Sequence, residues 1–200
     1  MSQALSLHPA LGDDAAAAQS AARASETLET ERLRLRPLTL EDAGWISRES
    51  SRPEVARMIA RVPLPNPPLF AEMFVLIARA SEAARGDCVR AIEDRKSAAP
   101  LGVIGLHPHQ NGWEFGYWLA RDAWGRGYAT EAGWALIEEA DRLSRGPITA
   151  GHFSDNPASG RVLEKLGFAY TGEVRETFSV GRMAKADNRV MARARAERYK

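Results

Sequence analysis

The segment 124–132, Trp-Gly-Arg-Gly-Tyr-Ala-Thr-Glu-Ala, contains the residue types that a backbone anion site needs. Gly125 and Gly127 allow a phosphate to approach the main chain closely. A helix is predicted directly after the second glycine, and free N–H groups at a helix N-terminus attract anions. Arg126 adds positive charge and Thr130 a hydroxyl group. We expect a phosphate-binding loop, although an ordinary strand-to-helix turn with two glycines has the same pattern.

Two common nucleotide-binding patterns do not fit this loop. It lacks the Gly-Lys-Ser/Thr of a P-loop, and it lacks the third glycine of a dinucleotide-binding fingerprint. The strands before it are also predicted to be antiparallel, whereas the dinucleotide fold has a parallel sheet. The loop therefore belongs to a different class of phosphate site.

A second informative segment follows the next predicted strand, and it contains Asn156, Pro157 and Ser159 before the run Leu-Glu-Lys-Leu-Gly-Phe at 163–168. Asn156 is well placed to cap a helix whose first residue is Pro157. Together the two segments resemble the GNAT superfamily of acyl-CoA-dependent N-acetyltransferases, and most closely its RimJ/RimL-like branch. The resemblance is specific over about 113–172 and plausible from Thr30 to the C-terminus.

The resemblance implies that acetyl-CoA (coenzyme A) is the cofactor. Its pyrophosphate would lie on the loop residues Gly125, Arg126, Gly127, Tyr128, Ala129 and Thr130. The family pattern Gln/Arg-x-x-Gly-x-Gly/Ala matches at Gly127 and Ala129, while Trp124 replaces the first residue. The strand end Tyr117, Trp118 and Leu119 would pair with the pantetheine arm, and Asn156 and Ser159 would complete the cofactor contacts. A β-bulge at Gly116 would splay this strand from its parallel neighbour.

Two residues are the expected catalytic groups. Ser159 lies where the branch carries a serine able to reach the departing thiolate, although a surface serine in a first helical turn is equally consistent. Glu114 would help to remove the proton of the attacking amine, directly or through water; its other interpretation is a solvated carboxylate at a strand start. The tyrosine acid of many GNAT enzymes is replaced by Leu163. Structural or surface roles are expected for the histidines, His107, His109 and His152.

The surrounding elements predict a mixed α/β fold. Strand patterns occur at 30–38, within 87–119 as an antiparallel meander, at 147–153, and after 167, with 189–195 the best candidate there. Helix patterns occur at 39–50, 68–85, 128–143 and 157–166. The crossover between 113–119 and 147–153 should make those two strands parallel neighbours. We therefore expect a GNAT-like, mostly antiparallel twisted sheet with one parallel strand pair and helices on both faces.

Composition limits the remaining possibilities. The chain has 200 residues, a formal net charge of +1 and one cysteine, Cys88, so a strongly basic nucleic-acid binder and an internal disulfide are excluded. No metal is expected, and no apolar run is long enough for a membrane span, so a cytoplasmic location is expected. Residues 1–26 are read as a flexible Ala-rich extension of a domain over 27–200.

The expected function is direct acetyl transfer to a primary amine, on a protein N-terminus or a small molecule, by a monomer or homodimer. A catalytically silent CoA-binding regulatory module and a protein–protein adaptor on the same fold are the alternatives. The absent tyrosine acid favours the first alternative, and the intact loop at 125–130 argues against the second.

Overall fold

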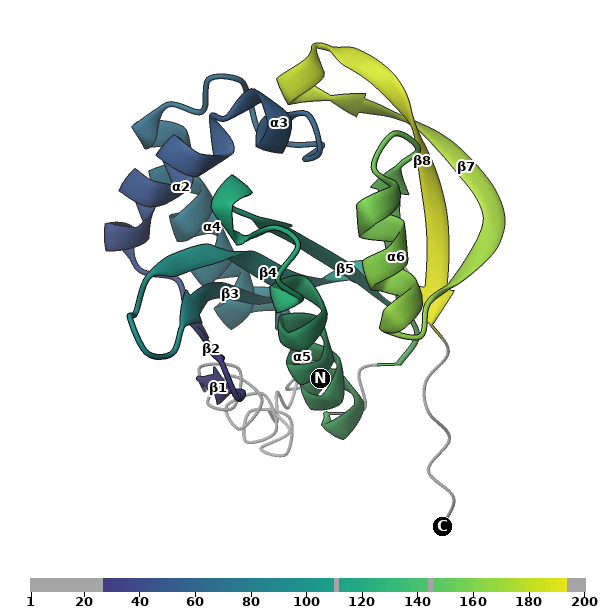
Figure 1. The fold of residues 1–200 in the computed structure, drawn as a ribbon. Coiled ribbons are helices and arrows are strands. Elements are labelled where there is room, and N and C mark those ends of the chain that lie inside the picture. Colours follow the sequence, from purple (N-terminus) through teal and green to yellow (C-terminus); the bar gives the residue numbers. More distant parts are fainter. Residues whose placement is uncertain (1–26, 110–111, 144–145, 194–200) are drawn as a thin grey trace, which may run out of the picture.

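The computed structural model describes residues 27–109, 112–143 and 146–193; the expected extension over 1–26 lies outside the described residues. These residues form an eight-stranded sheet in the order β1-β2-β3-β4-β5-β6-β8-β7 (Figure 1). The strands are β1 Leu28–Glu29, β2 Leu33–Pro37, β3 Cys88–Asp94, β4 Pro100–His109, β5 Gly112–Leu119, β6 Ile148–Phe153, β7 Ala169–Ser179 and β8 Ala184–Arg193. The helices are α2 Ala43–Ser50, α3 Pro53–Ala56, α4 Pro68–Arg85, α5 Tyr128–Arg142 and α6 Pro157–Lys165, with 3₁₀ turns η1 Leu40–Asp42, η2 Arg121–Ala123 and η3 Val180–Arg182.

The predicted strand directions are confirmed. The ladders β3–β4 and β4–β5 are antiparallel, so 87–119 is a meander, whereas β5 and β6 are parallel neighbours. The sheet is therefore mixed, with one parallel pair, as the crossover through α5 requires.

The strands β5 and β6 separate where the sequence predicted that they would, although the predicted cause is wrong. Their pairing runs only from Trp113 opposite Ile148 to Phe115 opposite Ala150. The β4–β5 register continues without a shift through Gly116, so this ladder contains no bulge there. Beyond Ala150, β6 continues to pair with β8 on its other edge, whereas its edge toward β5 has no ladder partner among the described residues.

Helices cover both faces of the sheet and produce two cores (Figure 1). One core lies between the sheet and the helices α5 and α6, and includes Leu35, Ile104 and Leu136. The other lies between the sheet and the helices α2 and α4, and includes Ile46, Val75 and Val103. The strand β5 contributes to both, since alternate side chains face opposite sides.

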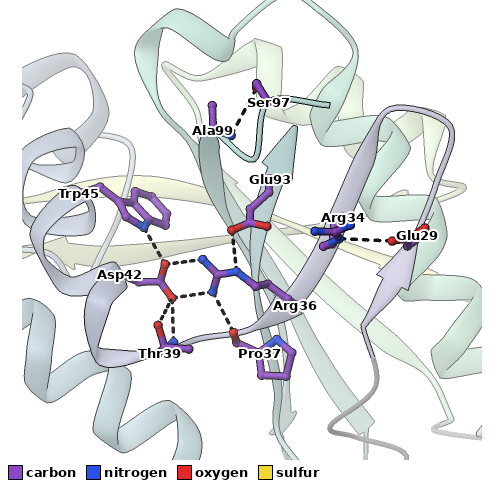
Figure 2. Close-up of polar contacts among 10 residues, drawn as sticks. All are labelled: Glu29, Arg34, Arg36, Pro37, Thr39, Asp42, Trp45, Glu93, Ser97 and Ala99. Carbon is purple, nitrogen blue, oxygen red and sulfur yellow. Dashed lines mark hydrogen bonds and ion pairs between the residues drawn. The ribbon is translucent and has the colours of Figure 1, made fainter. Parts of the chain in front are cut away.

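An ionic network attaches α2 to the sheet (Figure 2). The Asp42 carboxylate accepts hydrogen bonds from both terminal nitrogens of Arg36, at 2.8 and 2.7 Å, and from Trp45 Nε1 at 2.8 Å. It also accepts from the Thr39 N–H at 2.7 Å, as in a capping box. Arg36 Nε binds Glu93 on β3 at 2.6 Å. One arginine thus joins the strands β2 and β3 to the start of α2.

The helix α4 has the predicted bounds, but its orientation is unexpected. Only Ala71, Val75 and Ala78 are buried, whereas its large apolar side chains are exposed. Small residues therefore face the sheet and α2.

The long β7–β8 hairpin curls back so that its tip lies beside α3 (Figure 1). The Val180 N–H donates to the Ala60 carbonyl at 2.9 Å. A Cβ on Gly181 would lie 2.8 Å from the Ala56 carbonyl oxygen, so this contact requires glycine.

Candidate active site

The loop before α5 presents a run of free backbone donors. Gly125 and Gly127 have φ values of 75° and 81°, in the left-handed region that favours glycine. Within the described part of the chain, the N–H groups of residues 125 to 129 donate to no protein acceptor; the first internal bonds come from Thr130 and Glu131 to the Gly127 carbonyl. Converging N–H groups at the positive end of a 15-residue helix can bind a phosphate.

Contacts from the β1–β2 turn hold this loop in place. The Glu131 carboxylate accepts from Thr30 Oγ1 at 2.6 Å, from the Arg32 N–H at 2.9 Å and from Arg32 Nε at 2.7 Å. Burial acts to raise the pKa of Glu131, but these hydrogen bonds outweigh it and lower the pKa below its ordinary value. Arg32 also donates to the Arg126 carbonyl at 3.1 Å. Glu131 therefore braces the loop as a paired anion.

The end of β5 leads directly to the loop. Trp124 Nε1 donates to the Leu119 carbonyl at 2.8 Å and closes the turn between strand and loop. Trp124 therefore has a structural role at the position where the family pattern has Gln or Arg. Since β5 pairs with β6 only as far as Phe115, the segment from Gly116 to Leu119 has an open edge next to the N–H groups.

On the α6 side of β5, the structure brings together three predicted residues. Tyr117 Oη donates to Ser159 Oγ at 3.1 Å. The Ser159 N–H donates to Asn156 Oδ1 at 3.2 Å, so Asn156 is the N-cap of α6. Burial raises the pKa of Tyr117 to about 12, although the contact with Ser159 opposes the rise. Tyr117 is thus a neutral donor that orients the Ser159 hydroxyl.

On the opposite face, Glu114 lies directly across the β4–β5 ladder from His107. His107 Nδ1 lies 2.7 Å from Oδ2 of Asp87, a carboxylate that is 2% exposed. The same carboxylate lies 3.3 Å from Arg85 Nε. When the Nδ1–H of His107 donates to Asp87, the free lone pair of the imidazole is on Nε2. This Nε2 atom points toward Gly105, where an added Cβ would lie 3.2 Å from it. Sequence reasoning missed Asp87.

The space beside this pair is open. Gly116 faces Gly105 across the ladder, and a Cβ on Gly116 would meet nothing within 4 Å. Trp118, which packs against Trp45 with ring centroids 5.7 Å apart and ring planes tilted by 43°, lies two residues along the strand. The imidazole is therefore next to a glycine-floored surface at the unpaired part of β5.

The segment 52–62 extends across the two diverging strands. Arg52 lies 3.8 Å from Asp122, just after β5, and Arg57 lies 3.0 Å from Asp155, just after β6. Arg182 from the hairpin tip binds both oxygens of Asp155, at 2.8 and 2.9 Å, and stacks over Phe153. Neither Asp155 nor Arg182 has a sequence signal that singles it out.

The other predicted groups have structural surroundings. His152 is buried, with Nδ1 2.9 Å from the Phe153 carbonyl and Nε2 3.1 Å from Tyr170 Oη. Cys88 is buried. Among the described residues, no three ligand side chains gather in a way that could hold a metal ion. In the same part of the chain, no helix is long and apolar enough to cross a membrane.

Comparison with known proteins identifies the family. Residues 32–169 match the family model described as an acetyltransferase (GNAT) domain. The chain is 32% identical over 155 residues to an uncharacterized N-acetyltransferase, p20, of Bacillus licheniformis, covering 76% of this chain and 86% of that protein.

Solved structures share the fold. A GNAT-family acetyltransferase from Bacillus anthracis aligns with a TM-score of 0.74 at 20% identity, covering 86% of this chain and 100% of the other. The ribosomal L7/L12 α-N-protein acetyltransferase RimL, solved with coenzyme A, aligns with a TM-score of 0.72 at 16% identity, covering 84% and 98%.

The chain belongs to the GNAT superfamily of acetyltransferases. It is an acetyl-CoA-dependent enzyme, so the two non-enzymatic alternatives are wrong. RimL, a protein of the predicted branch, is among the structural neighbours that share this fold.

Proposed function

We propose that this enzyme transfers an acetyl group from acetyl-CoA directly to a primary amine, on a protein N-terminus or a small molecule. The observation that carries the proposal is the run of free N–H groups at residues 125 to 129 beside the unpaired end of β5. When bound, acetyl-CoA supplies the acetyl group as a thioester. RimL, whose name describes an α-N-protein acetyltransferase, makes a protein N-terminus the first acceptor to test.

The cofactor contacts follow from the groups present. The main-chain donors of Gly125, Arg126, Gly127, Tyr128 and Ala129, with the Thr130 hydroxyl, fit a pyrophosphate because they carry partial positive charge and lack protein acceptors. The open edge at Tyr117, Trp118 and Leu119 offers amide groups for a pantetheine arm, as in strand addition. Asn156 fixes the first turn of α6 on the other side of the opening.

Glu114 and His107 lie on the side from which an amine proton can be removed. We assign His107 Nε2 as the base that accepts the amine proton through one water, because Asp87 stabilises the imidazolium that forms. Glu114, across the ladder from His107, adds negative charge to the same surface. Its charge also contributes, after Glu173, to raising the pKa of the nearby Arg175 on β7.

Ser159 is assigned to the departing sulfur. Tyr117 stays protonated and donates a hydrogen bond to Ser159 Oγ. The hydroxyl hydrogen of Ser159 is therefore free to donate to another acceptor. With acetyl-CoA bound, that hydroxyl would donate a hydrogen bond to the sulfur as the amine nitrogen bonds to the carbonyl carbon and the C–S bond breaks. The released thiolate would then take its proton from solvent.

The proposal is tested by calorimetry with acetyl-CoA and by thiol release with N-terminal peptides, polyamines and aminoglycosides. Gly127→Trp should abolish binding, because it adds bulk to the loop and strains a positive φ. Gly172→Trp is the control, since Gly172 also has a positive φ (86°) but lies on β7, away from the loop. Equal acetyl-CoA affinities for the two variants would refute the loop assignment, and binding without thiol release for any amine would refute amine transfer.

A further inference from the structure

The strongest feature outside the active site is the exposed apolar face of α4. Leu69 is 62% exposed, Ile77 59% and Phe70 53%, and the others that share this face are Met73, Phe74 and Leu76. Single exposed leucines are ordinary, but six large apolar side chains on one helix form a contiguous patch of the kind that marks an interaction site.

This face runs along the whole helix. Leu69, Met73 and Leu76 follow the spacing i, i+4, i+7, and Phe70, Phe74 and Ile77 repeat it one residue later. Ala80 and Ala84 continue the stripe to the last turn and are also exposed. The buried residues Ala71, Val75 and Ala78 lie on the other side. The helix is thus apolar on two opposite sides, which is typical of a helix that packs against other structure on each of them.

Side-chain size along the stripe is self-complementary. The N-terminal half carries the large Leu69 and Met73, whereas the C-terminal half carries the small Ala80 and Ala84. If a second α4 packs antiparallel about a two-fold axis between Leu76 and Ile77, Leu69 lies opposite Ala84 and Met73 opposite Ala80. Large side chains then fill the space left by small ones, as close packing requires.

Charges on the flank agree with the same arrangement. Glu72 and Arg79 are both exposed and lie two helical turns apart on one side of the stripe. In the antiparallel register, Glu72 of one copy lies about 3 Å along the axis from the level of Arg79 of the other, because the offset is about two residues. The balanced charges also differ from the Lys/Arg-rich polar face of a membrane-surface helix.

We propose that α4 is an isologous dimer interface, in which the exposed faces of two α4 helices pack antiparallel and Glu72 pairs with Arg79 of the second copy. The interface lies apart from the acetyl-CoA loop at residues 125–129, so it does not depend on the proposed acceptor. The occupant of this face is a second copy of the chain.

The test is the oligomeric state of the full chain, measured by sedimentation velocity across a dilution series. We expect a dimer, which Met73→Glu with Ile77→Glu converts to a monomer that still binds acetyl-CoA. Glu72→Arg and Arg79→Glu should each raise the dimer Kd about tenfold, since each creates two repulsive pairs per dimer. The double exchange Glu72→Arg/Arg79→Glu should return the Kd to within about threefold of the original.

Glu164→Arg, an equal charge reversal at an exposed position of α6, is the control and should leave the Kd unchanged. The proposal would be overturned if the chain were a monomer at all concentrations, whether or not that monomer binds lipid vesicles. It would also be overturned by a dimer that the α4 substitutions do not affect, or by a double exchange that does not restore association.

Discussion

At the scale of single residues, two side-chain pairs carry the proposed chemistry. In the pairs Asp87 with His107 and Tyr117 with Ser159, one partner fixes the orientation of the group that we propose to act on the amine or on the sulfur. They lie on opposite faces of the sheet near the open edge of β5. The amine and the thiolate sulfur need opposite proton transfers, so separate groups on separate sides suit the reaction.

The first prediction concerns His107. His107→Ala should lower kcat/KM for the amine about a hundredfold, because a positioned base contributes roughly this factor. Asp87→Asn should lower kcat by a smaller factor, since the imidazole remains but loses its carboxylate. Acetyl-CoA affinity, measured by calorimetry, should stay unchanged in both variants.

His109→Ala is the control for His107→Ala, since His109 lies two residues further along β4. Its kcat/KM should match that of the unmodified enzyme. Full activity of His107→Ala, combined with a large loss in Glu114→Gln, would show that Glu114 and not His107 accepts the proton. Rescue of His107→Ala by added imidazole would support the assignment to His107.

At the scale of elements, the helices α2 and α6 are fixed by polar contacts at their starts. Asn156 caps α6 and thereby positions Ser159. The close approach of α6 to β6 depends on Gly160, where a Cβ would lie 2.7 Å from Tyr170 Oη and 2.8 Å from His152 Nε2. Asp42 fixes the start of α2 in the same way, since its carboxylate is only 2% exposed and accepts hydrogen bonds from three residues.

The second prediction is that Asp42→Asn lowers the free energy of unfolding by about 3 kcal/mol at neutral pH, because it leaves the half-buried Arg36 poorly compensated. Burial acts to raise the pKa of Asp42, but hydrogen bonds from Arg36, Thr39 and Trp45 lower it below the ordinary 3.8. A depressed pKa gives stability above pH 3.8 that is lost as pH falls through the folded-state pKa. The two proteins should therefore converge in acid.

Denaturant unfolding at several pH values measures this effect, and Glu41→Gln is the control because Glu41 is the exposed neighbour on η1. A constant difference between Asp42→Asn and the unmodified protein down to the most acidic pH would contradict the assigned role of the carboxylate.

At the scale of the whole molecule, the diverging strands are bridged by parts of the chain that are distant in sequence. The segment 52–62 contacts the hairpin tip, and Asp155 binds Arg57 and Arg182 together. The Arg182 hydrogen bond is the main cause of the lowered pKa of Asp155. The bridge lies next to the ends of β5 and β6, so we expect an acceptor amine to meet this part of the structure.

The third prediction follows from this bridge. Asp155→Ala should raise KM for the acceptor several-fold and leave acetyl-CoA affinity unchanged, because the phosphate loop is not part of the bridge. The loss of stability should be about 1 kcal/mol or less, since Asp155 is 43% exposed at its side chain and solvent screens such pairs. Steady-state kinetics with the amine varied, together with a thermal melt, measures both effects.

Glu176→Ala is the control, because it removes an exposed ion pair with Lys185 on the β7–β8 hairpin, outside the bridge. An equal rise of acceptor KM in both variants would show a general effect of surface charge. A change in acetyl-CoA affinity for Asp155→Ala would show that the bridge acts on the cofactor side instead.

The sequence by itself determined most of the elements and the conformation of the loop at 124–130, but it did not predict α3 or the turn between β1 and β2. Glycines at 125 and 127, a helix start at Tyr128 and the cap at Asn156 are local features, because a turn or a helix end depends on residues a few positions apart. The parallel pairing of β5 and β6 could also be predicted, since chain connectivity restricts a crossover to one hand.

Only the tertiary structure decided which side chains meet. Near the β3–β4 turn, Glu93 pairs with Pro100, and this register continued along the ladder would place His107 opposite Gly86. The irregularity between Ile92 and Glu93 shifts the register by one residue, so that His107 instead lies opposite Asp87. A one-residue shift moves every side chain to the other face, and no local pattern shows it. The contact of Tyr117 with Ser159 depends in the same way on how α6 docks.

The orientation of α4 was undetermined for a related reason. Both of its sides are apolar, so periodicity could not say which one faces the sheet. Packing selected Ala71, Val75 and Ala78, and left Leu69, Met73 and Ile77 outside. A sequence pattern records which residues avoid water, whereas the tertiary structure decides which of them the fold itself covers.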